Sequence, residues 1–157
     1  MKNSQISDYL EIGNQLPIAG QATDPRSLGY VYVIGFARND IVKIGSATCP
    51  QSRLLSLQCG NPFELRVLGL VCVYEGSAFE IEHAAHKVAS SRRIRGEWFA
   101  MEPHEAVEAI IKAARNMKAK FGAYSVERRR IDAEYDAEIS NREDQRRANM
   151  RRKLGID

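Results

Sequence analysis

The sequence has no uninterrupted apolar stretch that approaches the roughly 20 residues needed to cross a bilayer. We therefore expect no membrane-spanning segment and no membrane partner. The N-terminal residues also lack the charged start, apolar middle and small-residue cleavage site that a secretory signal requires. These two absences predict an intracellular, cytoplasmic protein.

Cysteine and net charge are also scarce. The three cysteines, Cys49, Cys59 and Cys72, are odd in number and form no CxxC pair, which argues against a structural zinc site and favours free or buried thiols. A formal net charge of +3 gives only weak overall attraction to nucleic acid. Binding of that kind therefore depends on local clusters of basic side chains.

The 157 residues divide into three predicted segments. Residues 1–28 form a lead-in segment with one short helix around Ser7 to Asn14, followed by an irregular stretch that contains Pro and Gly. Residues 29–121 form the functional domain, since a core of roughly 75 to 100 residues buries enough surface to fold unaided. Residues 122–157 form a charged helical extension.

The first half of the domain predicts a hairpin, a helix and a long strand. β-Branched and aromatic residues alternate over Tyr30–Phe36 and Ile41–Gly45, with a polar turn between them. Pro50 opens a helix, and Leu65–Tyr74 has the composition of a long apolar strand. The helix is expected to direct three leucines toward the core, Leu54, Leu55 and Leu57.

The second half of the domain predicts two helices with a short strand between them. Ser77 and Glu80 form a capping box for a helix over Ala78–Ser91. Gly96–Met101 is expected to be a strand, and Pro103 opens the second helix. The expected buried residues are Ile81, Ala85 and Val88 in the first helix and Val107, Ile110, Ile111 and Ala114 in the second. This order of elements predicts an α+β fold.

Strand alternation in the hairpin separates apolar from polar side chains. Tyr30, Tyr32 and Lys43 share one face, and the opposite face carries Val31, Val33, Val42 and Ile44. Arg53 is at the first turn of the following helix, so its side chain can extend over the polar face. Its guanidinium could bind two oxygens of a phosphate. A phenol, an amine and a guanidinium are therefore expected close together.

Glu82 and His86 are four residues apart and project from one side of their helix. A cation on Glu82, water activation by Tyr32 and positive charge from Arg53 are the parts that metal-assisted phosphodiester hydrolysis needs. A zinc site is disfavoured, because His83 and His86 do not have the i, i+4 spacing of an HExxH helix.

Several of these residues also have plain structural interpretations. Glu82 alone could be an exposed carboxylate that pairs with His86. Trp98 and Phe99 are most simply core or hydrophobic-wall residues, and Glu97 is expected to brace an arginine such as Arg93 rather than act chemically.

The motifs occur in an order that resembles the GIY-YIG nucleases, in the branch common in phage and fungal proteins. The resemblance spans about residues 29 to 101 and implies a small, mainly three-stranded antiparallel sheet flanked by helices. The residues that carry it are Gly29-Tyr30-Val31-Tyr32, Lys43-Ile44-Gly45-Ser46, Pro50, Arg53-Leu54, Leu57-Gln58, Asn61-Pro62, Glu82 with His86, and Gly96-Glu97-Trp98-Phe99.

The resemblance also implies a site, with Tyr32 as general base, Arg53 on the phosphate and Glu82 carrying one Mg²⁺ or Mn²⁺ ion. Lys43 stands where the second motif of the family usually begins with tyrosine. Its ammonium is expected to lower the pKa of the Tyr32 phenol or to touch the phosphate itself. The expected catalytic set is Tyr30, Tyr32, Lys43, Arg53, Glu82 and His86.

From Tyr124 onward, Arg, Glu and Asp dominate and predict a long, mostly solvated helix. Its basic residues are expected to contact phosphates without recognising particular bases. The alternatives are that the helix mediates a homodimer or is simply exposed to solvent. The expected nucleic-acid contacts are Lys43, Arg53, Arg128, Arg129, Arg130, Arg146 and Arg147, with further basic residues at Arg142, Arg151, Arg152 and Lys153.

Two functions follow as hypotheses. The leading one is an endonuclease that uses one Mg²⁺ or Mn²⁺ ion to hydrolyse phosphodiester bonds, with DNA as the preferred substrate. The alternative is a non-catalytic nucleic-acid-binding or assembly module that retains the fold, because a fold alone does not guarantee chemistry.

Overall fold

The computed structural model describes residues 5–10, 29–38 and 40–156, with the side chains of 125–133, 135 and 136 left out of the description. The chain divides into two compact units, Met1–Val126 and Glu127–Asp157. The described part of the predicted N-terminal helix is α1, Ile6–Leu10. The rest of that helix and the irregular stretch up to residue 28 lie outside the described residues.

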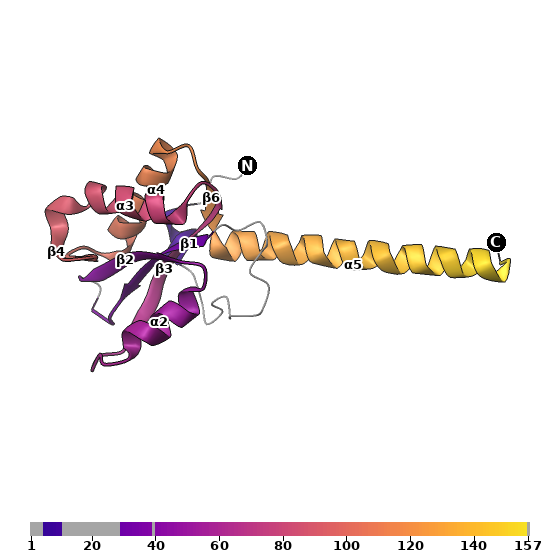
Figure 1. Cartoon of the computed structure of the whole chain (residues 1–157), viewed down its shortest axis with the longest axis horizontal. Helices are drawn as coiled ribbons and strands as arrows, with labels where there is room; N and C mark the ends of the chain where they lie inside the picture. The colour runs from indigo at the N-terminus through magenta and orange to yellow at the C-terminus, as the bar shows by residue number, and fades with distance from the viewer. Residues whose placement is uncertain (1–4, 11–28, 39, 157) are drawn as a thin grey trace. The chain divides into compact units, whose positions relative to one another are not determined.

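Within the described residues, the first unit contains a six-stranded antiparallel sheet in the order β4-β5-β2-β1-β3-β6 (Figure 1). The strands are β1 (Gly29–Gly35), β2 (Val42–Ala47), β3 (Arg66–Glu75), β4 (Arg93–Arg95), β5 (Trp98–Phe99) and β6 (Lys120–Ala123). The α+β class is confirmed. The expectation of a mainly three-stranded sheet is wrong, because short strands extend the central β2-β1-β3 group at both edges.

Helices cover both faces of the sheet (Figure 1). α2 (Pro50–Gln58) packs on one face, whereas α1, α3 (Ala78–Val88) and α4 (Pro103–Asn116) pack on the other. The helical layer of α1, α3 and α4 buries the larger of the two apolar clusters. The face beneath α2 carries Tyr30, Tyr32 and Ile34.

The central hairpin has the predicted alternation. Val31, Val33, Val42 and Ile44 are fully buried beneath α3 and α4. Removing an aliphatic side chain of this size from water contributes about 1.5–3 kcal/mol to stability. Burial of these four side chains therefore determines which face of the hairpin packs against the helices. The tyrosines are consequently directed to the opposite face, toward α2.

Two predicted core positions are wrong. Leu55 is 63% exposed, because α2 packs on the sheet through Leu54 and Leu57, which are three residues apart on one side of the helix. Val88 is 40% exposed. It is the last residue of α3, which ends three residues earlier than predicted and gives way to a 3₁₀ turn at Ser90–Arg92.

The other helix predictions are largely confirmed. The Ser77 hydroxyl accepts a hydrogen bond of 3.2 Å from the Glu80 backbone N–H at the start of α3. α4 begins at Pro103 behind a capping box formed by Glu102 and Glu105. Its predicted apolar stripe is buried, at Val107, Ile110, Ile111 and Ala114.

The predicted strand at Gly96–Met101 is shorter in the structure, where β5 contains only Trp98–Phe99. Gly96 has a φ of +56°, in the left-handed region that glycine adopts without strain. This residue turns the chain between β4 and β5, so the two short strands pair with each other and β5 pairs with β2. The turn places Glu97 beside the central hairpin.

The C-terminal segment forms the predicted long charged helix, α5, over Tyr124–Leu154. Its described side chains from residue 137 to residue 156 are exposed. Across the described parts of the chain, no helix is both long and apolar enough to cross a membrane. None of the three cysteines, Cys49, Cys59 and Cys72, which all lie in the described part of the chain, forms a disulfide.

Candidate active site

Tyr32 is placed by a glycine on the neighbouring strand. Tyr32 in β1 stands opposite Gly45 in β2. A Cβ at position 45 would lie 2.2 Å from the Tyr32 hydroxyl oxygen and 2.3 Å from its Cζ, so only glycine lets the ring lie against the strand. The ring is 2% exposed. Tyr30 lies in the same cluster on the same face and is also buried.

Burial raises the pKa of Tyr32 to about 12. Arg53 opposes this rise, and the negative charge of Glu82 adds to it. The predicted lowering of the Tyr32 pKa is therefore wrong, because desolvation of the phenol outweighs the nearby positive charge. The cation that favours the phenolate is Arg53 rather than Lys43.

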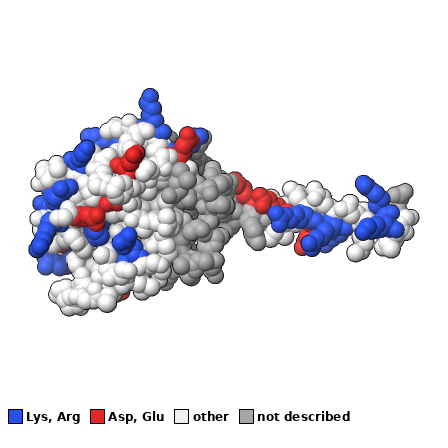
Figure 2. Space-filling model, viewed as in Figure 1, with Lys and Arg blue, Asp and Glu red and all other residues white. Residues whose placement is uncertain are grey.

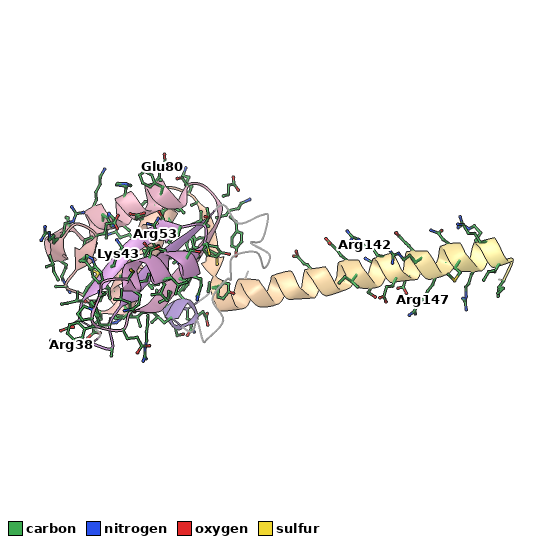
Figure 3. All side chains as sticks on the ribbon, turned by 60° about the horizontal axis from the view of Figure 1, so that its bottom comes forward. Arg38, Lys43, Arg53, Glu80, Arg142 and Arg147 are labelled. Atoms are coloured by element: carbon green, nitrogen blue, oxygen red, sulfur yellow. The ribbon has the colours of Figure 1, made fainter. Side chains whose placement is uncertain are left out.

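Lys43 is 8% exposed, which is unusual for a lysine. Burial lowers the pKa of its ammonium, Glu82 opposes that lowering, and Arg53 adds to it. Tyr32 and Lys43 thus both respond to Arg53 and Glu82, so α2 and α3 bring a guanidinium and a carboxylate within electrostatic reach of both groups. Figure 3 shows Lys43 on the sheet and Arg53 on α2, the helix that covers this face.

Glu97 forms an ion pair with Lys43. The carbonyl oxygen of Glu97 accepts a 3.1 Å hydrogen bond from the Ile44 N–H, which fixes the turn against β2. The prediction that Glu97 braces an arginine is therefore wrong, and Arg93 instead lies over the Phe99 ring at 5.5 Å. Glu97 was missed as a site residue, because its partner depends on pairing between distant strands.

Glu82 is buried and held by two neighbours. The Ser46 hydroxyl donates a hydrogen bond to Oε2 of Glu82, and Nε2 of His86 lies 3.7 Å from Oε1. His86 Nε2 also lies 2.9 Å from the carbonyl oxygen of Ile44, so this nitrogen carries the proton and donates. Ser46 has no role in the predicted site, although it follows directly on the Lys43-Ile44-Gly45 motif.

Glu82 is the residue of this site that was predicted to hold a hard divalent cation. Mg²⁺ and related ions bind through one or two carboxylates, with water and substrate phosphates completing the shell. Glu82 supplies one carboxylate, oriented by Ser46 and His86. Among the residues that the structure describes, no group of three or more His, Cys, Asp or Glu side chains could hold a metal ion by itself.

The predicted basic residues of the extension belong to the second unit. Arg142, Arg146 and Arg147 are exposed on α5, and Figure 3 labels the first and last of them. The side chains of Arg128, Arg129 and Arg130 lie outside the described ones. Nucleic-acid contact by this helix stays a prediction.

Fold and geometry together define an α+β domain with a buried phenol and a buried amine on the α2 face of its sheet. A guanidinium on α2 and a buried carboxylate on α3 shift the pKa of both groups. The model of the T5orf172 domain family matches residues 29–115, over half of the chain, and the chain belongs to this family. The family is a phage-associated domain of the endonuclease-like type. No curated protein and no solved structure matches the chain.

Proposed function

We propose that the chain is a metal-dependent endonuclease of the GIY-YIG type that hydrolyses nucleic-acid phosphodiester bonds, with DNA as its substrate. The observation that carries the proposal is the electrostatic coupling of Tyr32 and Lys43 to both Arg53 and Glu82. A base, two cations and a metal-binding carboxylate are the groups this reaction requires. All four residues fall within the matched region.

Tyr32 is the group assigned to accept the proton of the attacking water. With a pKa of about 12, only roughly one phenol in 10⁵ is ionised at pH 7. The base form therefore needs more positive charge than Arg53 alone provides. Glu82 would hold a divalent ion, and that ion would supply such charge, which would polarise the scissile phosphate and lower the pKa of the nearby phenol.

Arg53 and Lys43 are assigned to the phosphate. A guanidinium can bind two phosphate oxygens at once and stabilise the charge that develops on them. Lys43 is already paired with Glu97, whose side chain is 45% exposed. A phosphate oxygen that approaches from the solvent side would join or replace Glu97 beside the ammonium.

Ser46 and His86 are positioning residues for Glu82. Each restricts one oxygen of the carboxylate, Ser46 by a hydrogen bond to Oε2 and His86 by its proximity to Oε1. The His86 ring is itself fixed by its hydrogen bond to Ile44. Precise placement of a metal-binding carboxylate commonly depends on such neighbours.

A plasmid-nicking assay with Mg²⁺ or Mn²⁺ tests the proposal. Glu82→Gln and Arg53→Ala are expected to stay folded and to lose cleavage by at least about 100-fold. Glu64→Gln and Arg66→Ala are matched controls, because Glu64 and Arg66 form an exposed pair outside the site. Nicking by Glu82→Gln at the rate of Glu64→Gln would reject the assigned site.

The second candidate is a nucleic-acid-binding or assembly module without catalysis. The observation that favours it is the high pKa of Tyr32, which keeps the phenol neutral when no further cation is present. Binding of nucleic acid by the intact chain, with no nicking at any Mg²⁺ or Mn²⁺ concentration, would support this module over the nuclease.

A further inference from the structure

Three aromatic side chains beside Lys43 have no role in the proposed reaction. Trp98 in β5 stands opposite Lys43 in β2, so both side chains lie on the Tyr32 face of the sheet. Phe36 stacks on Trp98 with ring centroids 5.6 Å apart and planes at 16°. Phe63 meets the Phe36 ring edge-on at 6.2 Å. Phe36, Phe63 and Trp98 together form an aromatic platform.

Phe63 is 68% exposed, yet hydrogen bonds hold its loop firmly. The Gln58 side-chain amide donates to the carbonyl oxygens of Asn61 and Phe63, at 3.2 and 3.0 Å, and accepts from the Leu65 N–H at 2.7 Å. The Asn61 side-chain oxygen accepts from the Phe63 N–H at 3.1 Å. The Leu57-Gln58 and Asn61-Pro62 motifs thus keep one exposed ring in place.

A single exposed apolar residue is common and needs no explanation. Phe63 differs because its backbone is already ordered, so a ligand that stacks on it need not offset the entropy of fixing the loop. The ring is also continuous with Phe36 and Trp98. An ordered, partly exposed aromatic surface of this kind is suited to a flat ligand.

Positive charge lies along one edge of the platform. Arg95 in β4 stands opposite Trp98 in β5, and all three residues of β4 are exposed. Figure 2 shows Lys and Arg side chains gathered at this edge of the sheet. The acidic neighbour of Phe63, Glu64, is paired with Arg66. Aromatic rings beside cations are suited to a nucleic-acid strand, because its bases can stack on the rings and its phosphates can pair with the cations.

We propose that the aromatic platform stacks an unpaired base of the nucleic-acid strand whose phosphate lies at Lys43 and Arg53, an inference that rests on the proposed function. Tyr32 and Phe36 are four residues apart in extended chain, a span of about 13 Å, so the stacked base lies within a few nucleotides of the reacting phosphate. The substrate class is therefore nucleic acid with a single-stranded segment beside the cleavage position.

Binding without cleavage tests this proposal. The intact chain is titrated in EDTA with a short single strand that carries 2-aminopurine, whose fluorescence falls on stacking, and with a blunt duplex of the same sequence. Phe63→Ala is expected to weaken single-strand binding by roughly 5- to 100-fold and to remove the fluorescence change. Phe63→Leu, which keeps apolar bulk but no ring, is expected to remove the change as well.

Phe79→Ala is the matched control, because Phe79 is 61% exposed on α3, over the opposite face of the sheet. It is expected to bind like the unaltered chain. The proposal is overturned by unchanged binding of Phe63→Ala, by an equal loss in Phe79→Ala, or by an equal loss on the blunt duplex. Phe63-dependent quenching in a chain that never nicks plasmid would reject the nuclease and retain the platform.

Discussion

Replacing Gly45 by alanine is expected to disable the site without altering any of its charged groups. The new Cβ would lie 2.2 Å from the Tyr32 hydroxyl oxygen and 2.7 Å from Cε2, well inside van der Waals contact. Tyr32 is also almost fully buried, so its ring can move only by displacing its neighbours. The overpacking should cost about 1–3 kcal/mol of unfolding free energy. A ring displaced by roughly 1 Å should slow cleavage about 100-fold.

Gly69→Ala provides the control for this experiment. A Cβ at position 69 would lie 2.8 Å from Val107 of α4, on the face away from Tyr32. Gly69→Ala should therefore lose a comparable amount of stability, measured by urea unfolding, while its cleavage rate per folded molecule stays near that of the unaltered chain. Equal rates for Gly45→Ala and Gly69→Ala would refute the idea that Gly45 positions the phenol.

Three further predictions concern charge. Burial raises the pKa of Tyr32 to about 12 from an ordinary 10, so the folded chain holds this proton more tightly than the unfolded chain does. The free energy of unfolding should therefore fall as pH rises from 10 to 12. Tyr32→Phe should show a smaller fall in its unfolding midpoint over that range, and an equal fall would contradict the shift. Glu97→Gln leaves the Lys43 ammonium without its partner and should lower the unfolding free energy by about 1 kcal/mol, whereas Glu64→Gln should change it little. Replacing Arg146 and Arg147 by alanine should reduce the slope of log affinity against log salt by about 2 in DNA-binding titrations, and an unchanged slope would identify α5 as a helix that does not contact DNA.

Local patterns in the sequence account for the centre of the fold. The alternation of Val31 and Val33 with Tyr30 and Tyr32 is readable because each strand residue changes face relative to the next. α3 and α4 can be predicted from the capping and proline residues at their N-termini and from the helical spacing of their apolar residues. These elements hold Tyr32, Lys43 and Glu82, so the elements that position the candidate residues could be predicted before the structure.

Pairing between distant segments could not be predicted in this way. β4 and β6 are only three and four residues long, too short for an alternating pattern to be recognised, so the strands at both edges of the sheet were missed. Glu97 meets Lys43 only because β5 pairs with β2. The raised pKa of Tyr32 was missed for a related reason, since sequence patterns indicate a neighbouring cation but not the degree of desolvation.

In the proposed reaction Arg53 and Glu82 act with Tyr32 as one catalytic unit, and a double-mutant cycle on single-turnover cleavage tests this most directly. Rates are measured with Mg²⁺ for the unaltered chain, Arg53→Ala, Glu82→Gln and the double variant. Residues that act as a unit are strongly non-additive, so the double variant should be little slower than the slower single variant. A double variant whose loss equals the product of the two single losses would contradict the shared site.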